Sequence, residues 1–404
     1  MRINIDRLMT DIDALAQVGR TPDGGVTRVA MSENDIAGRA WFRARVEAAG
    51  LAFRADGGGN LSAILDMGAD ETLLMGSHLD TVPNGGRFDG ALGVLCALEV
   101  VRTLYDAGTS LPVNVEAISF TDEESSVFSM LGSRAVTGVL RADNLTALPN
   151  QAQFDAGMQR LGITPESILS AGRDDIRAFV EVHIEQGTRL EEQGFHIGVV
   201  PSIVGIRTFR LQFIGEAAHA GTMPMEKRRD ALWGVSEFVQ QARQLVMAQF
   251  SPGVMNVGQL RIANSASNIV PAQVTISLEF RHGSVLQLDA METALLQLAQ
   301  SAAEQNNLEL TVEPVNSIPP ATMNDTITGA ITAAADALKL SHTPLFSFAG
   351  HDAQTMARRF PTGMFFVPSV NGISHNPQEF TRREDIENAA NVLLHTILAL
   401  AEPI

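Results

Sequence analysis

The chain has 404 residues, 45% of them hydrophobic, and a formal net charge of −17. This length accommodates two domains, or one large domain with an insertion, and the composition is typical of a packed globular protein. The acidic balance argues against nucleic-acid binding, because phosphate contacts require clustered Lys and Arg. Cys96 is the only cysteine, which excludes an intrachain disulfide, and its apolar surroundings predict a buried thiol.

The first 203 residues alternate helical and strand-like periodicities, as in an α/β domain. Helices are predicted at 3–18, from Ser32 onward and at 91–104, and strands at 61–65, 72–75, 113–120, 178–182 and 197–200. The N-terminus has no signal-peptide core, and the apolar run 91–101 is too short for a membrane span and contains Glu99. We therefore expect a cytoplasmic protein that does not contact a membrane.

From residue 204 the order of elements changes to β-α-β-β-α-β, the split order of ferredoxin-like domains. The predicted strands are 204–214, 254–262, 274–280 and 308–312, and the helices are 228–247 and 285–303. We predict an inserted domain at 204–317, which ends before Pro319 and Pro320. Residues 1–203 and 318–404 would together form the catalytic domain, a mixed, mostly parallel sheet flanked by helices. Its last elements are helices at 325–338, after Gly350 and at 383–400, and a strand at 364–367.

Four predicted strands each lead to side chains that can bind a metal ion. In chain order these are His78 with Asp89, Glu123 with Glu124, His183, and His375. Because the carboxyl ends of parallel strands meet at one edge of a sheet, these residues can converge. Histidines combined with carboxylates suit zinc, manganese or cobalt. Two adjacent glutamates also allow one to bind metal while the other moves protons.

Each residue of this set also has a purely structural interpretation. A histidine after a strand can be a hydrogen-bonded loop residue, and an aspartate in the Gly-rich segment 76–90 can be a turn residue. Adjacent glutamates can mark the start of a solvated helix. The coincidence of all four at one topological position favours a shared metal site.

The segments GSHLDTVPNGGRFDG, TDEE, HIEQG and ISHNPQE resemble the zinc-dependent amidase/hydantoinase/carbamoylase family, which is related to aminoacylases and binuclear zinc exopeptidases. The resemblance extends nearly from end to end. It implies two Zn²⁺ ions, with Mn²⁺, Co²⁺ or Ni²⁺ as alternatives, and a homodimer formed through an inserted lid domain. One ion would be bound by His78 and His183, the other by Glu124 and His375, and both by Asp89. Asp80 would orient the imidazole of His78, and Glu123 would be the general base.

The same resemblance implies substrate-binding residues. His219, in GEAAHAG, would reach the active site of the partner subunit and polarise the scissile carbonyl. Asn268 and Arg281 match positions that hold the substrate carboxylate, and the guanidinium fork suits that task. Considered as residues alone, Asn268 can be a turn residue and Arg281 can pair with a neighbouring acid. The remaining matches to substrate positions are Gln186, Gly350 and His351.

Some residues depart from the family pattern without removing a ligand. Met223 stands where relatives often carry Thr, Ser125 stands where Gly is common, and Arg207 lies near an allantoate-contacting arginine. Phe348 and Ala349 precede Gly350 where smaller residues are usual. These departures bear on the choice of substrate rather than on the metal site.

We predict a hydrolase that cleaves the ureido C–N bond of a small, anionic N-carbamoyl-L-amino acid, releasing the amino acid, carbon dioxide and ammonia. Allantoate or ureidoglycolate hydrolysis is the nearest alternative. An aminoacylase or dipeptidase is less favoured, because peptide-cleaving relatives usually present an acid where His183 stands. A non-catalytic protein with a relic site is disfavoured by the retention of Glu123 and every ligand.

Overall fold

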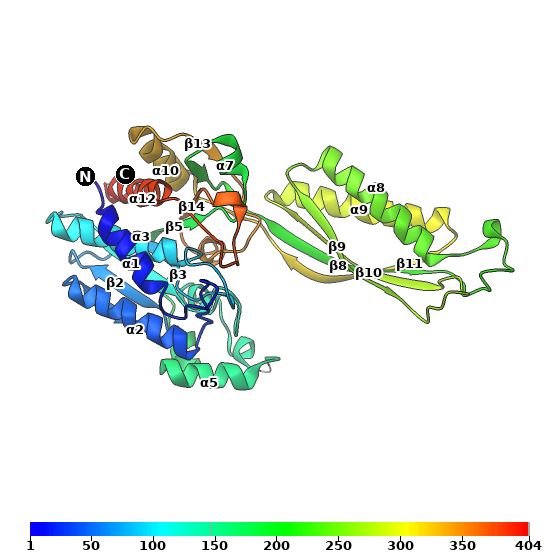
Figure 1. The fold of residues 1–404 in the computed structure, drawn as a ribbon, viewed down its shortest axis with the longest axis horizontal. Helices are drawn as coiled ribbons and strands as arrows, with labels where there is room; N and C mark the ends of the chain where they lie inside the picture. Colours follow the sequence, from blue (N-terminus) through cyan, green and yellow to red (C-terminus); the bar gives the residue numbers. More distant parts are fainter. Residues whose placement is uncertain (147, 403–404) are drawn as a thin grey trace. The chain divides into compact units, whose positions relative to one another are not determined.

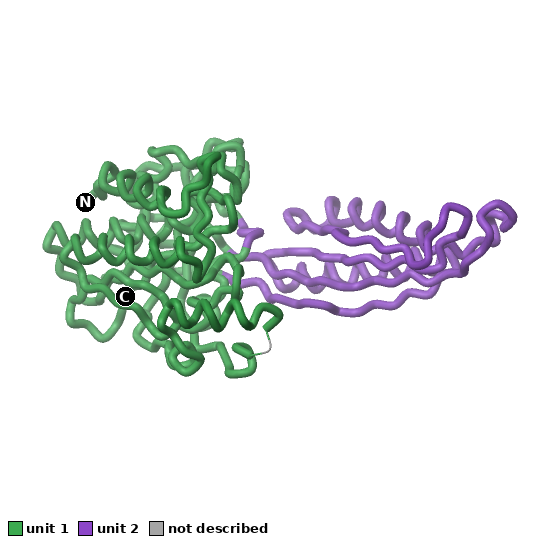
Figure 2. Tube along the Cα trace, turned by 60° about the horizontal axis from the view of Figure 1, so that its bottom comes forward, with its two compact units in different colours: residues 1–201, 323–345, 350–404 green, residues 202–322, 346–349 purple. Residues whose placement is uncertain are grey.

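The computed structural model describes residues 1–146 and 148–402, which form two compact units (Figures 1 and 2). Unit 1 comprises residues 1–201, 323–345 and 350–404, and unit 2 comprises 202–322 and 346–349. Unit 2 therefore extends a few residues beyond the predicted insertion at each end. The reason is that the short strands β7 (Ser202–Ile203) and β12 (Ala321–Thr322) pair with each other and so join both ends of the insertion.

Unit 1 is built around a mixed sheet with the strand order β1-β2-β4-β3-β5-β14-β6-β13 among the described residues. Its four central strands are mutually parallel, as predicted: β4 (Asn114–Phe120), β3 (Thr72–His78), β5 (Ile176–Ile184) and β14 (Thr362–Val367). They are almost entirely buried, which explains why they are continuous apolar runs in the sequence. The flanking strands are β1 (Ala52–Ala55), β2 (Leu61–Leu65), β6 (Ile197–Val199) and β13 (His342–Pro344).

Helices pack on both faces of this sheet. Side chains alternate along β5, so Val182 joins the apolar cluster of α3 (Ala91–Asp106), whereas Glu181 accepts a hydrogen bond from the backbone of α11 (Asp352–Met356). Helix α3 is apolar on nearly all sides and buries Cys96, as expected for a helix inside a core. Helices α1 (Ile5–Leu15) and α12 (Arg383–Ala401) pack against α3, and α10 (Asp325–Ala337) packs against α12.

The segment between β4 and β5, which the sequence resolved only loosely, forms several short helices. They are α4 (Leu131–Val136), η1 (Ala142–Leu145), α5 (Gln151–Leu161) and α6 (Pro165–Leu169). A small apolar cluster centred on the fully buried Phe154 holds them together. The remaining helices of unit 1 are α2 (Glu33–Ala48), α7 (Arg189–Gln193) and η3 (Val370–Gly372).

Unit 2 has an antiparallel sheet of order β11-β8-β10-β9, the ferredoxin-like arrangement predicted from the element order (Figure 1). The strands are β8 (Gly205–Ile214), β9 (Val254–Ile262), β10 (Gln273–His282) and β11 (Glu309–Ile318). Helices α8 (Ala231–Gln249) and α9 (Val285–Gln305) share one apolar core with a single face of the sheet, and η2 (Met225–Lys227) precedes α8. Strand β11 runs past the predicted end at residue 312, because Pro314 lies at a register shift on an edge strand, where proline is tolerated.

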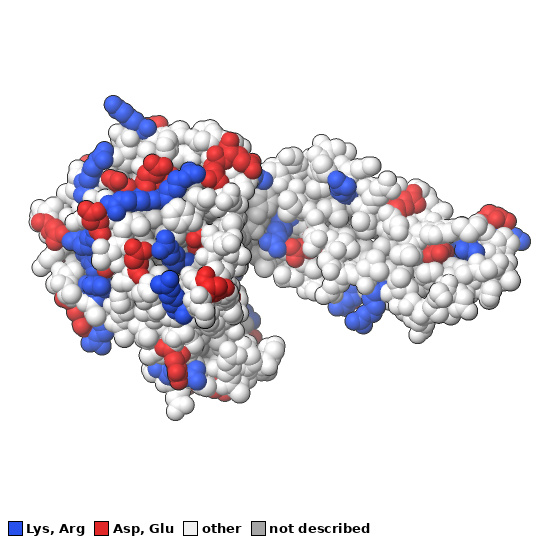
Figure 3. All heavy atoms as spheres, in the orientation of Figure 1, with Lys and Arg blue, Asp and Glu red and all other residues white. Residues whose placement is uncertain are grey.

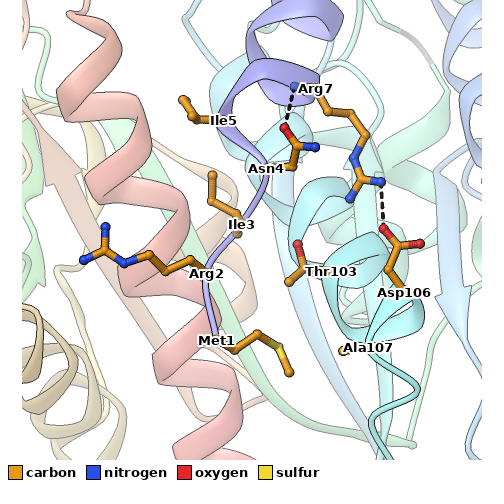
Figure 4. A pocket seen from close by; sticks show the side chains of 9 residues that line it. All are labelled: Met1, Arg2, Ile3, Asn4, Ile5, Arg7, Thr103, Asp106 and Ala107. Atoms are coloured by element: carbon orange, nitrogen blue, oxygen red, sulfur yellow. Dashed lines mark hydrogen bonds and ion pairs between the residues drawn. The ribbon is translucent and has the colours of Figure 1, made fainter.

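The N-terminal helix is attached to α3 by polar contacts (Figure 4). Arg7 donates from Nε to Glu99 at 2.7 Å and from Nη1 to Asp106 at 2.8 Å, beside a groove of about 490 Å³. Glu99, the one acid in the apolar run 91–101, is thus a buried residue with an arginine partner. Among the described residues, no helix combines the length and apolarity needed to cross a bilayer.

Candidate metal centre and active site

The parallel strands bring the five predicted ligands together at their carboxyl ends. His78 ends β3, His183 is the penultimate residue of β5, and the remaining ligands lie in the loops after β3, β4 and β14. Among the described residues, two groups of possible ligand atoms lie within 4.8 Å and share Asp89: one contains His78 and His183, and the other contains Glu124 and His375. This is the pairing that the family resemblance implies.

Both buried histidines present Nε2 to the shared carboxylate. The Nδ1 atom of His78 lies 2.9 Å from the carbonyl oxygen of Asp80, and that of His183 lies 2.9 Å from the carbonyl oxygen of Ile184. Because a carbonyl only accepts, both Nδ1 atoms carry a proton, and Nε2 is the nitrogen that faces Asp89 Oδ1, at 3.7 Å for His78 and 3.1 Å for His183. Once its proton is displaced, Nε2 is thus the nitrogen of each ring that can bind a metal ion.

Asp80 contributes to the centre in two ways. Its backbone carbonyl makes the close contact with His78, while its carboxylate lies 3.8 Å from the same nitrogen. The carboxylate instead accepts a hydrogen bond from the backbone N–H of Glu124 at 3.3 Å. Asp80 therefore links the loop after β3 to the loop after β4, in addition to orienting the imidazole.

The charges of the cluster favour a cation. Burial opposes ionisation of Asp89, but the imidazoles of His183, His375 and His78 hold its pKa well below the usual range. In turn, Asp89 outweighs burial and raises the pKa of His183 to about 9, while Asp89 and Glu124 raise the pKa of His375 to about 10. The cluster thus attracts positive charge at the imidazoles of His183 and His375, and a divalent cation supplies that charge when it displaces the protons. Imidazole nitrogens with carboxylate oxygens fit zinc or a related divalent ion.

Glu123 lies beside these two groups and forms a third group of possible ligand atoms with His78 and Glu124. It is 8% exposed, and its Oε2 is 3.6 Å from Nε2 of His78. Burial, together with the negative charges of Asp352 and Glu124, raises the pKa of Glu123 well above its usual range. A buried carboxylate with this bias readily accepts a proton, which is the property expected of a general base.

The site loops contain non-glycine residues in the left-handed backbone region. Asp122 has φ +57°, and its carboxylate accepts hydrogen bonds from the backbone N–H groups of Ser126 and Val127 at 2.9 and 3.0 Å. His375 has φ +54° and Ser125 has φ +59°. The conformation at Ser125 explains why glycine is common there, and such strain is typical of functional loops.

A glycine sets the distance between α3 and the first ligand. Gly90 precedes α3 with φ +62°, and a Cβ atom at this position would lie 2.3 Å from the ring of His78. Its backbone N–H lies 3.2 Å from Nε2 of His183. Only glycine therefore allows the helix to begin against the two imidazoles.

Three of the predicted substrate residues lie in unit 1. Gln186 donates from Nε2 to Asp89 Oδ2 at 2.8 Å, so its amide contacts the shared carboxylate directly. His351 is buried and packs edge-on against His183, with 4.5 Å between ring centroids. Burial, reinforced by the neighbouring imidazole of His183, lowers the pKa of His351 well below its usual value. Gly350 lies in the exposed loop immediately before it.

Two further predicted residues lie side by side in unit 2. His219 pairs with Ile269 in an isolated bridge, and the N–H of Ala220 donates to the carbonyl of Asn268 at 2.9 Å. Both His219 and Asn268 are exposed.

Arg281 lies at the other end of the unit 2 sheet. It is opposite Ile206 near the start of β8, whereas the segment carrying His219 follows the end of β8 at Ile214. Eight strand residues at about 3.4 Å each separate the two ends by about 27 Å.

The two arginines of unit 2 that the sequence analysis singled out both have acidic partners. Arg281 donates from Nε and Nη2 to Glu279 Oε1 at 2.9 and 2.8 Å. This is the pairing with a neighbouring acid that the sequence analysis gave as the alternative to substrate binding. Arg207 pairs in register with Phe280 and therefore faces the helices, away from Arg281. There it binds Asp289 and Glu292 of α9.

Several residues that contact the centre were not identified from the sequence. Ser374 Oγ lies 2.7 Å from Asp89 Oδ2, and Glu379 accepts the backbone N–H of Asp89 at 3.0 Å. Both flank His375 in the segment ISHNPQE, so their proximity to a ligand was a signal that could have been used. Glu181 and Asp352 are fully buried acids that were also missed, although Glu181 lies two residues before His183 and Asp352 directly follows His351.

Comparison with known proteins identifies the family of this chain. Residues 74–399 match the sequence model of peptidase family M20/M25/M40. The chain is 34% identical to an N-carbamoyl-L-amino acid amidohydrolase of Geobacillus stearothermophilus, with 98% of each chain covered, and 34% identical to an allantoate amidohydrolase of Escherichia coli (strain K12), with 96% of each covered. A crystal structure of a hydantoinase/carbamoylase family amidase from Burkholderia multivorans superposes with TM-score 0.91 at 34% identity, covering 100% of this chain and 99% of that one. The resemblance inferred from the motifs is confirmed, and the chain belongs to the hydrolases of peptidase family M20/M25/M40.

Proposed function

We propose that this protein is a binuclear metal-dependent amidohydrolase that cleaves the ureido C–N bond of a small N-carbamoyl-L-amino acid. The observation that carries the proposal is the position of Asp89, shared by two ligand groups next to the buried Glu123. The two groups together provide three imidazoles and two carboxylates, a donor set suited to a pair of Zn²⁺ ions, with Mn²⁺, Co²⁺ or Ni²⁺ as alternatives.

The chain's own residues supply proton transfer and orientation. Bound cations would polarise the scissile carbonyl and make a water molecule more acidic. Glu123 accepts the proton from that water as it adds to the carbonyl carbon, and then donates it to the leaving nitrogen. Cleavage consumes one water and yields the amino acid, carbon dioxide and ammonia. Asp80 and the backbone contacts of His78 and His183 hold the two imidazoles in a fixed orientation while the reaction proceeds.

The layout of unit 2 supports a site completed by a second copy of the chain. A small substrate spans less than the distance of about 27 Å along β10, so it cannot touch both Arg281 and His219 of one chain. A homodimer formed through unit 2 resolves this, because His219 of the partner subunit can then act beside Arg281. In this arrangement unit 2 serves as both lid and dimerisation domain, and Asn268 accompanies His219.

The substrate assignment rests on fewer contacts than the metal site. Arg281 suits the single carboxylate that all the candidate substrates carry, and Arg207 binds Asp289 and Glu292. Allantoate and ureidoglycolate remain the alternatives, since relatives at similar identity are named for allantoate and ureidoglycolate hydrolysis.

A substrate panel tests this assignment. Metal-replete protein is incubated in parallel with N-carbamoyl-L-amino acids, allantoate, ureidoglycolate, N-acetyl amino acids and dipeptides, and ammonia and amino acid release are measured. We expect the highest kcat/KM for a carbamoyl-L-amino acid. A preference for allantoate or ureidoglycolate would show that the proposed substrate is wrong. Release of amino acid only from dipeptides would show that the proposed reaction class is wrong.

A complementation experiment tests the shared site. Glu123→Gln and His219→Ala are each expected to be inactive as homodimers. After mixed reassembly, a statistical population has half heterodimers, each with one intact site, so about one quarter of wild-type activity should return. Absence of recovery despite proven heterodimers would place His219 in the site of its own chain or outside any site.

A further inference from the structure

Glu379 is a buried acid that joins two loops of the metal centre without belonging to a ligand group. It lies in the loop after His375, is 4% exposed, and is absent from the groups of possible metal ligands among the described residues. Its Oε1 atom accepts the backbone N–H groups of Phe88 and Asp89 at 2.8 and 3.0 Å. These contacts connect positions almost three hundred residues apart, so the fold rather than local sequence creates them.

The second oxygen of Glu379 reaches the shared carboxylate through a hydroxyl. Ser374 Oγ lies 3.0 Å from Glu379 Oε2 and 2.7 Å from Asp89 Oδ2, and donates its proton to one of them. The same Oδ2 atom is the one that faces Nε2 of His375, at 3.3 Å. Glu379 thus contacts the backbone of Asp89 on one side and the residue preceding His375 on the other.

The loop after β3 leaves space for the Glu379 carboxylate at Gly86. A Cβ atom at Gly86 would lie 2.0 Å from Cδ and Oε1 of Glu379, so any larger residue would displace the acid. Close approach to a backbone is a recognised reason for glycine.

We propose that Glu379 is a positioning residue that aligns Asp89 with His375 and thereby defines the cation position formed by Asp89, Glu124 and His375. His78 and His183 are held instead by backbone carbonyls and face Asp89 Oδ1, whereas the hydroxyl link from Glu379 reaches Oδ2, so only the shared Asp89 connects their cation position to Glu379. Loss of Glu379 therefore weakens one of the two positions selectively. This inference rests on the two-cation centre proposed above.

The test is a zinc titration of the full-length protein against a competing chelator, with zinc content measured after dialysis at fixed free zinc. Glu379→Ala should weaken the second cation by about 10–100-fold, the usual cost of removing a group that orients a ligand, and leave the first within about threefold. Glu379→Gln keeps an acceptor for the two N–H groups and a partner for Ser374, so it should restore most of the affinity. Gln378→Ala, a change at the exposed neighbouring residue, is the matched control.

Independent variants keep the test decisive if Glu379→Ala does not fold, which thermal unfolding would reveal. Gly86→Ala displaces the acid without removing its charge, and Ser374→Ala removes the hydroxyl link, so both should reproduce the selective loss. Unchanged binding of both cations, equal loss of both, or a Glu379→Gln defect as large as that of Glu379→Ala would overturn the proposal. Wild-type protein that binds only one cation would instead refute the two-cation centre itself.

Discussion

In unit 1 the candidate catalytic groups are mostly buried at the ends of parallel strands, whereas in unit 2 the proposed substrate residues lie on an exposed loop and at a strand end. The ligands of unit 1 are oriented by backbone carbonyls and by acids from several loops. The residues of unit 2 have surface partners, such as Glu279 beside Arg281. On the face shown in Figure 3, charged side chains are dense over unit 1 and sparse over unit 2.

This difference indicates a division of roles. A buried cluster with low solvent access holds geometry to within tenths of an ångström, as proton transfer and metal binding require. A half-buried arginine with a neighbouring acid, such as Arg281, can exchange partners when an anionic substrate arrives. We therefore expect a change at the buried Glu123 of unit 1 to abolish chemistry and a change at Arg281 of unit 2 to alter substrate binding.

The strongest effect is expected in the buried cluster. Glu123→Gln keeps the shape of the side chain but removes the proton acceptor, so turnover should fall by about 10²–10⁴-fold while metal content stays unchanged. Ammonia release and metal analysis of the same preparation measure both quantities, with the first-turn residue Glu166→Gln of α6 as an exposed control. Loss of metal in Glu123→Gln would identify Glu123 as a ligand and not as the base.

A smaller effect is expected in unit 2. Arg281→Ala should weaken the binding of the transition state of carboxylate substrates by about 2–4 kcal/mol, as calculated from the fall in kcat/KM, because the carboxylate loses its charged partner. Arg210→Ala is a suitable comparison, since Arg210 lies on the same sheet face and pairs with Glu313. Steady-state kinetics with a substrate that lacks the carboxylate should show little change, and equal losses for both substrates would contradict a role in carboxylate binding.

Removal of metal should affect unit 1 alone. A ligand that binds only the folded state at 100 times its Kd stabilises it by about 2.7 kcal/mol, so a chelator should lower the unfolding temperature of unit 1. Hydrogen exchange followed by mass spectrometry separates the two units, and restoring zinc is the control. If the amides of unit 2 lost protection to the same extent, the independence of the two regions would be disproved.

The smallest effect is expected at a strained position in the loop after β4. Ser125→Gly relieves a left-handed backbone conformation at the cost of an exposed contact between Ser125 Oγ and Ser129, and should stabilise the protein by about 0.5 kcal/mol. Denaturant unfolding measures the change. Ser126 is the next residue and does not have a positive φ, so Ser126→Gly should destabilise the protein instead. An increase in stability in both variants would show that backbone strain is not the cause.

Hydrophobic pattern and strand-end chemistry were sufficient to predict most of this architecture. The central strands are continuous apolar runs because both faces are buried, and His78, Glu124 and His183 follow or end them. The predictions were least complete where tertiary pairing overrides local signals. Strands β1 and β13 are short edge strands, and β11 passes through Pro314 because the sheet accommodates it at a register shift.

The sequence by itself determined the order of the main elements and pointed to the residues proposed as ligands, because periodicity and residue chemistry are local properties. Only the tertiary structure decided which atoms act: that the carbonyl of Asp80 contacts His78, that Arg207 faces the helices, and that Glu379 reaches the backbone of Asp89. Each of these depends on strand register or on contacts between loops distant in the chain. Such contacts arise from packing of the whole sheet, which a local pattern of residues does not encode.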